Sequence, residues 1–326
     1  MPKKSKAAVL ETKTIDILEE DIKSLSPALL KILLKDMTTG KNIRWACDEY
    51  AEHGPTYRAE KEIMPRQITG KNTKVIQPRT EKSKEDQKNR TKKSAEVFTP
   101  SWICNEMNNH CDDVWFGREN VFNTATGQTW TPNPNRIEFD DNPKKTWQKY
   151  VDSTRLEITC GEAPYLVSRY DTTTGEQLPI SHRIGIIDRK LRVVNENTQS
   201  EADWFKWAKR AFESSYGFEY QGDNVLLARE NLLWTFIENY RERFQNNPPI
   251  SQIRAIAKVI AWNIWQMDGL NDTTPYSKPS DLEEQMSLFE TKQEDTPLST
   301  KIMDWRHRHP KEIFFKDLKK GAHNEV

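Results

Sequence analysis

The sequence predicts an α/β fold with an open sheet, and three predicted strands carry this prediction. Residues 155–158 alternate polar and apolar side chains and lead into a tight Cys160-Gly161 turn. Residues 216–221 form a second strand pattern ahead of a long helical pattern, and a largely apolar stretch ends at Asp268. Each segment carries an acidic residue near its end. Open α/β sheets bind ligands at the carboxyl ends of their strands, so we expect a binding site there.

The bulk composition allows a sizeable core and excludes a globally basic protein. The chain has 326 residues, enough for one large domain or two small ones, with 35% apolar and 30% charged residues. Its 11 Trp, 12 Phe and 9 Tyr residues each supply a large apolar area to a core. The formal net charge is zero, so a surface that binds nucleic acid would have to be a local patch.

Targeting signals and cysteine spacing indicate the cellular compartment of the protein and whether it binds a metal. The sequence shows no secretory signal and no apolar run of membrane-spanning length, so we expect a soluble, cytoplasmic protein without a membrane partner. Cys104, His110 and Cys111 lie close together in the sequence. Their spacing does not match a closed structural zinc site, so we expect reduced, mostly buried thiols and no metal.

Residues 1–93 are predicted to form a helical and charged N-terminal region. Ser26-Pro27 and the apolar residues after it are typical of a helix start, and Thr38-Thr39-Gly40 ends that helix. From Arg79 to Lys93 the chain holds seven basic and three acidic residues. We interpret this basic segment as a solvated linker, with contact to DNA phosphates as the alternative.

Residues 94–275 hold the predicted strands and most of the predicted helices. Helical spacing of apolar residues follows the Phe98-Thr99-Pro100 segment and runs to residue 116. The 155–171 segment is predicted as strand, turn and helix, and helical spacing recurs over residues 182–196 and 223–244. The remaining residues, 276–326, are predicted as an acidic linker and a short C-terminal segment with a strand at Phe314-Phe315.

These segments, in this order, resemble the S-adenosylmethionine site of amino-group DNA methyltransferases of the γ type. Those enzymes are modification subunits, or "subunit M" proteins, of restriction systems. The resemblance covers about residues 94–275. It implies a Rossmann-like S-adenosylmethionine-dependent methyltransferase fold, incomplete at its C-terminus, with a helical N-terminal extension. It also implies double-stranded DNA as the substrate and methylation of adenine.

The resemblance assigns S-adenosyl-L-methionine as the cofactor and names its contacts. An upstream FTP segment, a glycine turn after the first strand, an acid after the second and an Asp after the third correspond to Phe98, Thr99, Pro100, Glu157, Thr159, Cys160, Gly161, Glu219 and Asp268. The family's first-strand motif usually has the form DPxCGxG. Here Glu157 replaces its Asp, and Ala163 or Pro164 stands where the second glycine would be.

The family's catalytic motif, [DNS]PP[YFW], has no clear counterpart. Asn247-Pro248-Pro249-Ile250 precedes the third predicted strand and ends in Ile, so we interpret it as a turn that ends a helix. Thr273-Thr274-Pro275-Tyr276 is in the expected order and keeps Pro and Tyr, which makes Tyr276 the candidate for stacking on a flipped base. Only 56 residues follow Leu270, which is short for the rest of the sheet and a target-recognition domain.

Three hypotheses therefore stay open. The chain is an adenine methyltransferase with a degenerate catalytic loop, or it is a cofactor- or DNA-binding subunit that needs a partner chain carrying an NPPY-type motif. In the second case a second methyltransferase or restriction subunit would be the partner, and an incomplete sheet would expose an edge to it. The third hypothesis is a DNA-binding module without a cofactor.

Overall fold

A three-stranded parallel sheet lies at the centre of the computed structural model, which describes residues 14–94, 96–278 and 297–321. Its strands are β3 (Arg155–Ile158), β4 (Ser215–Glu219) and β5 (Ile264–Gln266), in the order β3-β4-β5. Parallel strands require crossover connections. Two helices cross from β3 to β4 and two more from β4 to β5, which confirms the predicted α/β class with a parallel sheet.

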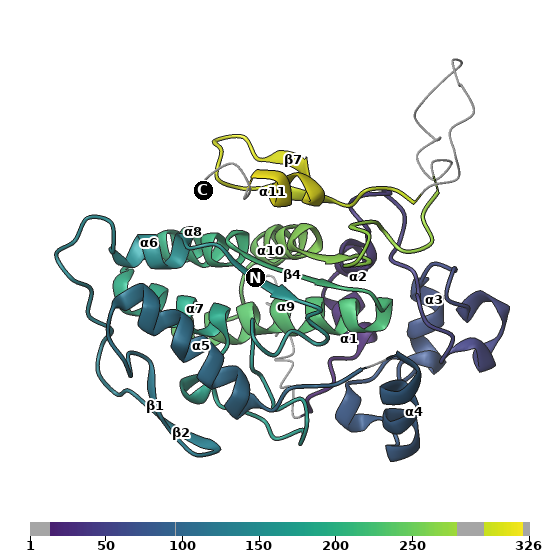
Figure 1. Cartoon of the computed structure of the whole chain (residues 1–326), viewed down its shortest axis with the longest axis horizontal. Coiled ribbons are helices and arrows are strands. Elements are labelled where there is room, and N and C mark those ends of the chain that lie inside the picture. The colour runs from purple at the N-terminus through teal and green to yellow at the C-terminus, as the bar shows by residue number, and fades with distance from the viewer. Residues whose placement is uncertain (1–13, 95, 279–296, 322–326) are drawn as a thin grey trace, which may run out of the picture.

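The remaining elements surround this sheet (Figure 1). The helices are α1 (Glu19–Leu25), α2 (Pro27–Leu34), α3 (Pro65–Ile68), α4 (Lys84–Ser94), α5 (Ser101–Phe116), α6 (Trp147–Asp152), α7 (Ile186–Asn197), α8 (Glu201–Glu213), α9 (Gly222–Phe244), α10 (Ile250–Asn263) and α11 (Phe315–Gly321). Short 3-10 helices are η1 (Ala51–His53), η2 (Pro55–Tyr57), η3 (Gly70–Asn72), η4 (Arg79–Glu81) and η5 (Ile180–His182). Two antiparallel hairpins pair β1 (Asn123–Thr126) with β2 (Thr129–Pro132), and β6 (Lys301–Asp304) with β7 (Lys311–Phe314).

The two faces of the sheet are covered by different parts of the chain. Side chains alternate between the faces of a strand. Ile264 packs into the large core built by the helices, whereas Phe218 and Trp265 point to the other face. There they meet Ile302 of β6 and Phe315 of α11. The predicted C-terminal strand is therefore present as β7, although Phe315 itself begins α11.

The N-terminal region packs directly on the helices that follow β4. Helix α2 contacts α9 and α10, and Leu29 and Leu33 of α2 are fully buried. Residues 42–46 then run past β5, where Trp45 accepts a hydrogen bond from the Gly222 amide. A Cβ atom at Gly222 would lie 1.9 Å from the Arg44 carbonyl oxygen, so this close approach requires glycine.

The basic segment from Arg79 to Lys93 is only partly solvated: Lys84, Lys88, Lys92 and Lys93 are exposed, whereas its two arginines form internal ion pairs. Arg90 is buried and pairs with Glu96 and Asp223, at 2.8 Å each. Lys82 reaches Asp223 at 3.3 Å. Burial alone would raise the pKa of Asp223, but Arg90 and Lys82 lower it to about 2. A buried carboxylate needs such partners, which composition alone does not reveal.

The helix predicted directly after the Cys160-Gly161 turn is also wrong. Residues 159–185 form a loop with one short 3-10 helix, and the next α-helix begins at Ile186. Ser168 holds this loop, since its hydroxyl accepts from the Ile184 amide at 2.7 Å and its amide donates to Asp188. Polar side chains that bond nearby main chain favour loops over helices, which explains the difference.

Two further findings concern the predicted acidic linker and the question of a membrane-spanning helix. Most of the predicted acidic linker falls on residues 279–296, which lie outside the described residues. Across the ranges that the structure does describe, no helix combines the length and the apolar character needed to cross a membrane.

Candidate cofactor site

A cavity of about 560 Å³ opens at the carboxyl ends of β3 and β4. We call it the strand-end cavity. Three separate stretches of the chain supply its lining, namely Glu96, Val97, Phe98, Thr99, Glu157, Ile158, Thr159, Cys160, Gly161, Pro164, Tyr165, Glu219, Tyr220, Gln221 and Asn224. Cavities of this size suit a nucleoside-sized ligand. Seven of the nine predicted cofactor contacts therefore line one cavity.

The turn after β3 forms one wall of the strand-end cavity. Thr159 and Gly161 both have positive φ angles, of 48° and 52°, and the Cys160 amide donates to the Phe218 carbonyl at 2.8 Å. A positive φ is uncommon for a β-branched residue such as Thr159. The strained main chain at Thr159 thus lies at the mouth of the cavity, where strain often accompanies function.

Glu157 fixes the loop that follows this turn. Its carboxylate accepts hydrogen bonds from the amides of Tyr165 (3.3 Å) and Leu166 (3.1 Å). Burial raises the pKa of Glu157 to about 8, although these two hydrogen bonds act in the opposite direction. Glu157 therefore lines the cavity and also holds its loop in place.

Glu219 joins the two strand ends. Its carboxylate accepts from the Gly161 amide at 2.9 Å and from the Tyr220 and Gln221 amides at 2.8 and 3.1 Å. Burial raises the pKa of Glu219 above its ordinary value. An ionised carboxylate has about four acceptor positions, so three amides leave one for a ligand donor.

The FTP segment closes the cavity from the N-terminal side. The Phe98 ring lies against Gly161, where an added Cβ would be 3.4 Å from the ring. The Arg79 guanidinium lies 5.2 Å from the centre of the same ring, a cation–π distance. Thr99 also lines the cavity, whereas Pro100 precedes α5 and does not.

Glu96 is a lining residue that sequence reasoning missed. Arg90 binds its carboxylate through two hydrogen bonds of 2.8 Å, and Asn224 donates to it at 2.9 Å. Burial would raise the pKa of Glu96, but Arg90 brings it below its ordinary value. Its only sequence signal is its place two residues before Phe98, which does not reveal a contact with α9.

Asp268 and Tyr276 do not line the strand-end cavity. The Asp268 carboxylate is turned into its own loop, where it accepts from the Leu270 amide (2.9 Å) and from Asn271. Tyr276 instead bonds to the side chain of Tyr220, which lines the cavity. Burial raises the pKa of Tyr220, and so does a side-chain hydrogen bond with Tyr276. The cavity wall thus reaches Tyr276 through Tyr220.

Asn247-Pro248-Pro249 lies far from the strand-end cavity, as the interpretation of a helix-ending turn implies. The motif follows the 23-residue helix α9, whose first turn lies beside the cavity at Asn224. A helix of that length spans roughly 35 Å at about 1.5 Å per residue. Pro249 then precedes the first residue of α10.

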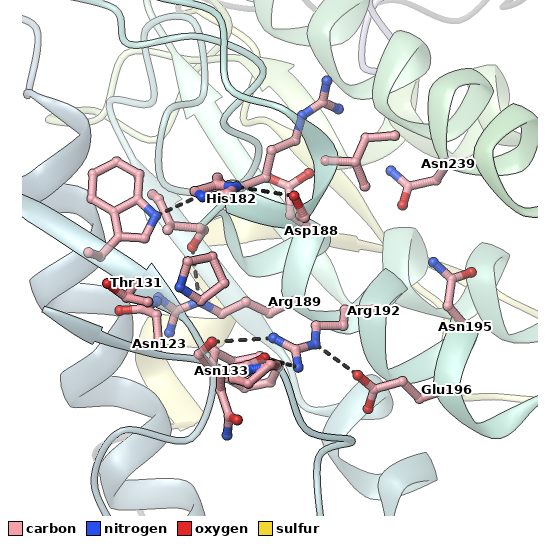
Figure 2. Close-up of a pocket in the computed structure, with 18 residues that line it drawn as sticks. Asn123, Thr131, Asn133, His182, Asp188, Arg189, Arg192, Asn195, Glu196 and Asn239 are labelled. Atoms are coloured by element: carbon pink, nitrogen blue, oxygen red, sulfur yellow. Dashed lines mark hydrogen bonds and ion pairs between the residues drawn. The ribbon is translucent and has the colours of Figure 1, made fainter.

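A second cavity, of about 620 Å³, lies between α7, the β1–β2 hairpin and the loop before α7 (Figure 2). Figure 2 shows Arg192 reaching toward Asn133 and Glu196. Its guanidinium donates to the Asn133 and Asn135 carbonyls and to Glu196, at 2.7 to 2.8 Å. Arg192 therefore fastens the hairpin to α7, and we assign this cavity a structural role.

Comparison with known proteins leaves the assignment to the geometry. No family model, no curated protein and no solved structure matches the chain.

Proposed function

We propose that the strand-end cavity binds S-adenosyl-L-methionine and that the chain is the cofactor-binding part of an adenine-specific DNA methyltransferase of a restriction system. One observation carries this proposal. The FTP segment, the glycine turn after β3 and the acid after β4 come from three distant parts of the sequence, and they line the same cavity at the ends of parallel strands. Such strand ends are the usual ligand site of open α/β sheets.

The charge of the lining favours a cationic ligand over a phosphate-bearing one. Glu96, Glu157 and Glu219 line the cavity, and no Lys, Arg or His is among the described residues that do. Dinucleotides and nucleoside triphosphates need cations or free amides for their phosphates. S-adenosylmethionine carries a sulfonium cation and no phosphate, so it fits this lining better than NAD or ATP.

The lining residues have separable roles in this proposal. Glu219 keeps one acceptor position for a ribose hydroxyl, and the Gly161 turn lets main chain approach the ligand. Phe98 covers the turn from the opposite side. The bound cofactor would supply an already activated methyl group, so the protein's main task is to position the reacting groups.

Catalysis by this chain alone has weaker support than cofactor binding. The only Pro-Pro pair of the sequence lies at the far end of α9, and Tyr276 reaches the cavity only through Tyr220. We therefore favour the hypothesis that a partner chain, a second methyltransferase or restriction subunit, supplies the catalytic motif and completes the DNA-binding site. Tyr276 remains the candidate catalytic residue for the stand-alone alternative.

Calorimetric titration with S-adenosylmethionine tests the proposal. We expect wild-type binding, and a loss of affinity of at least about tenfold in Glu219→Gln, since the amide weakens the acceptor. Glu213→Gln, two residues before the same strand, is the matched control and should bind normally. Binding of NAD with equal affinity, or no binding by a folded wild-type chain, would overturn the proposal.

The same titration at several pH values tests the cationic nature of the ligand. Burial raises the pKa of Glu157 to about 8, so this carboxyl holds a proton at neutral pH that a bound cation would displace. Binding should therefore release protons, and affinity should rise between pH 6.5 and 8.5. An affinity that falls over this range would show that a proton on Glu157 does not compete with the bound cofactor.

A further inference from the structure

Among the described residues, no strand pairs with the outer edge of β3. Alternate residues of a parallel strand direct their amides and carbonyls to opposite neighbours. The Arg155 amide donates to the Ser214 carbonyl at 3.0 Å, so Arg155 and Glu157 face β4 while Leu156 and Ile158 face away from it. Within the described part of the chain, the one hydrogen bond at this edge is from the Thr159 hydroxyl to the Ile158 carbonyl. We call the main chain of Leu156 and Ile158 the open edge.

The layer that covers the apolar face of the sheet stops before β3. Ile158, Phe218 and Trp265 form one row across the three strands. Trp265 is 3% exposed and Phe218 is 5% exposed, but Ile158 is 64% exposed. Leu156, on the same face of β3, is 42% exposed. The C-terminal hairpin and α11 thus bury two strands of the row and leave the third in contact with solvent.

A groove continues this apolar face toward α11. It has a volume of about 230 Å³, and Leu156, Tyr216, Trp265, Phe315 and Leu318 are among the residues that line it. Leu318 is itself 45% exposed. An apolar side chain from a neighbouring strand could therefore pack between β3 and α11.

Nothing in the strand protects the open edge. Natural edge strands are usually blunted by Pro, by an outward Lys or by a bulge. β3 has none of these, and its two charged residues, Arg155 and Glu157, point to the face that the helices cover. Parallel sheets are normally covered on both faces, and most have more than three strands.

We propose that a second polypeptide adds a strand parallel to β3 at the open edge and thereby brings the catalytic loop to the strand-end cavity. This inference rests on the function proposed above. Ile158 belongs both to the open edge and to the lining of the cavity. A parallel strand ends beside this cavity, so the loop after it would lie over the ligand. An antiparallel strand, as a two-fold copy of this chain would supply, would begin there instead.

Amide hydrogen exchange at single-residue resolution tests the pairing directly. The probe is a candidate partner polypeptide that carries an Asn-Pro-Pro-aromatic motif, sought among the reading frames next to that of this chain. In the free chain we expect the amides of Arg155 and Glu157 to be protected and those of Leu156 and Ile158 to exchange at least about tenfold faster. In the complex, Leu156 and Ile158 should become protected as well.

Substitution at the open edge tests whether the same surface holds the complex together. Leu156→Lys places a charge where the partner strand would pack and should weaken assembly by at least about tenfold, as measured by light scattering after size exclusion. Leu270→Lys is the matched control, because Leu270 is 95% exposed and lies after β5. Titration with S-adenosylmethionine separates the two proposals, since Leu156 does not line the cavity and Leu156→Lys should bind the cofactor normally.

Each outcome decides the inference. Assembly that is lost in Leu156→Lys and kept in Leu270→Lys, with protection of the Leu156 and Ile158 amides, would support it. Assembly that tolerates Leu156→Lys would overturn it, and so would the absence of any such neighbouring chain or of binding to it. A wild-type homodimer that Leu156→Lys dissociates would overturn it in favour of a second copy. In all these cases normal cofactor binding would leave the proposed function standing.

Discussion

The two edge strands of the central sheet, β5 and β3, differ in how far the rest of the chain covers them. At β5 the N-terminal region covers the strand, and Ile264, Trp265 and Gln266 are all at most 3% exposed. At β3 no described residue pairs with the outer main chain, and Leu156 and Ile158 are 42% and 64% exposed. The same sheet therefore has one covered edge, at β5, and one exposed edge, at β3.

The covered edge at β5 is stabilised by a polar side chain that donates hydrogen bonds to main-chain carbonyls. Arg229 of α9 donates to the carbonyls of Ile264, Ala261, Leu33 and Lys35, which joins β5, α10 and the end of α2. Burial lowers the pKa of Arg229 to about 10. Within the described ranges, no comparable side chain reaches the outer side of β3, which agrees with the proposal that a partner strand pairs there.

The largest effect is expected at Arg229. Arg229→Met should lower the free energy of unfolding by about 4 kcal/mol, because four buried carbonyls would lose their donor. Urea unfolding followed by Trp fluorescence measures this change. Arg254→Met is the control, since Arg254 is exposed and reaches only the Ser26 hydroxyl of the same N-terminal region. Equal, small losses in both variants would contradict the role of Arg229.

Glu157 of β3 points to the helix-covered face of the sheet, and its titration should change the free energy of unfolding with pH. Because burial raises the folded pKa from 4.5 to about 8, the protonated carboxyl is favoured in the folded chain. Its stabilising contribution is complete below pH 4.5 and is lost as the pH rises through 8. Between pH 5 and 8.5, wild type should lose roughly 4 kcal/mol more than Glu157→Gln, from about 1.4 kcal/mol per pKa unit.

The pH experiment has an internal control in the variant itself. Other buried carboxyls, such as Glu219 and Glu162, also have raised pKa values and titrate in both proteins. Only the difference between the two unfolding curves reports Glu157. Parallel curves over the whole range would show that Glu157 is not held protonated.

Gln266 is expected to have the next largest effect. Its amide bridges Arg44 and the Tyr220 carbonyl through three hydrogen bonds of 2.8 Å. Gln266→Leu should lower the free energy of unfolding by about 2 kcal/mol and expose the N-terminal region to limited proteolysis. Gln128→Leu, at an exposed hairpin turn, should do neither. A proteolysis pattern unchanged from wild type would show that Gln266 does not hold the N-terminal region against β5.

Strong local patterns made part of this structure predictable from the sequence. The predicted helix over residues 223–244 is α9, and the strands at 155–158 and 216–221 are β3 and β4, with Glu219 at the end of β4. Long apolar periodicity and a glycine turn after an alternating strand are local properties. They are sufficient to bring Gly161 and Glu219 into one cavity.

Long-range and competing local interactions explain what the sequence did not reveal. Arg90 pairs with Asp223, which lies far away in the sequence, as well as with Glu96, and no periodicity predicts such a contact. Asp268 was predicted to contact the cofactor, but its carboxylate bonds the main chain of its own turn, as Asp side chains commonly do. Exposure of the β3 edge depends on where the covering layer ends, which only the packed structure shows.

The smallest effect on stability is expected at the open edge, and it allows a direct comparison of the same kind of substitution in β3 and β5. Leu156→Thr should change the free energy of unfolding by less than about 0.5 kcal/mol, because the side chain is 42% exposed and Thr suits a strand. Ile264→Thr, in the covered edge strand, replaces a fully buried side chain and should cost about 2 kcal/mol or more. Thermal unfolding of the two variants measures the contrast. If Leu156→Thr destabilised the free chain as much as Ile264→Thr, the chain itself would already be covering β3, and no surface would be left there for a partner strand.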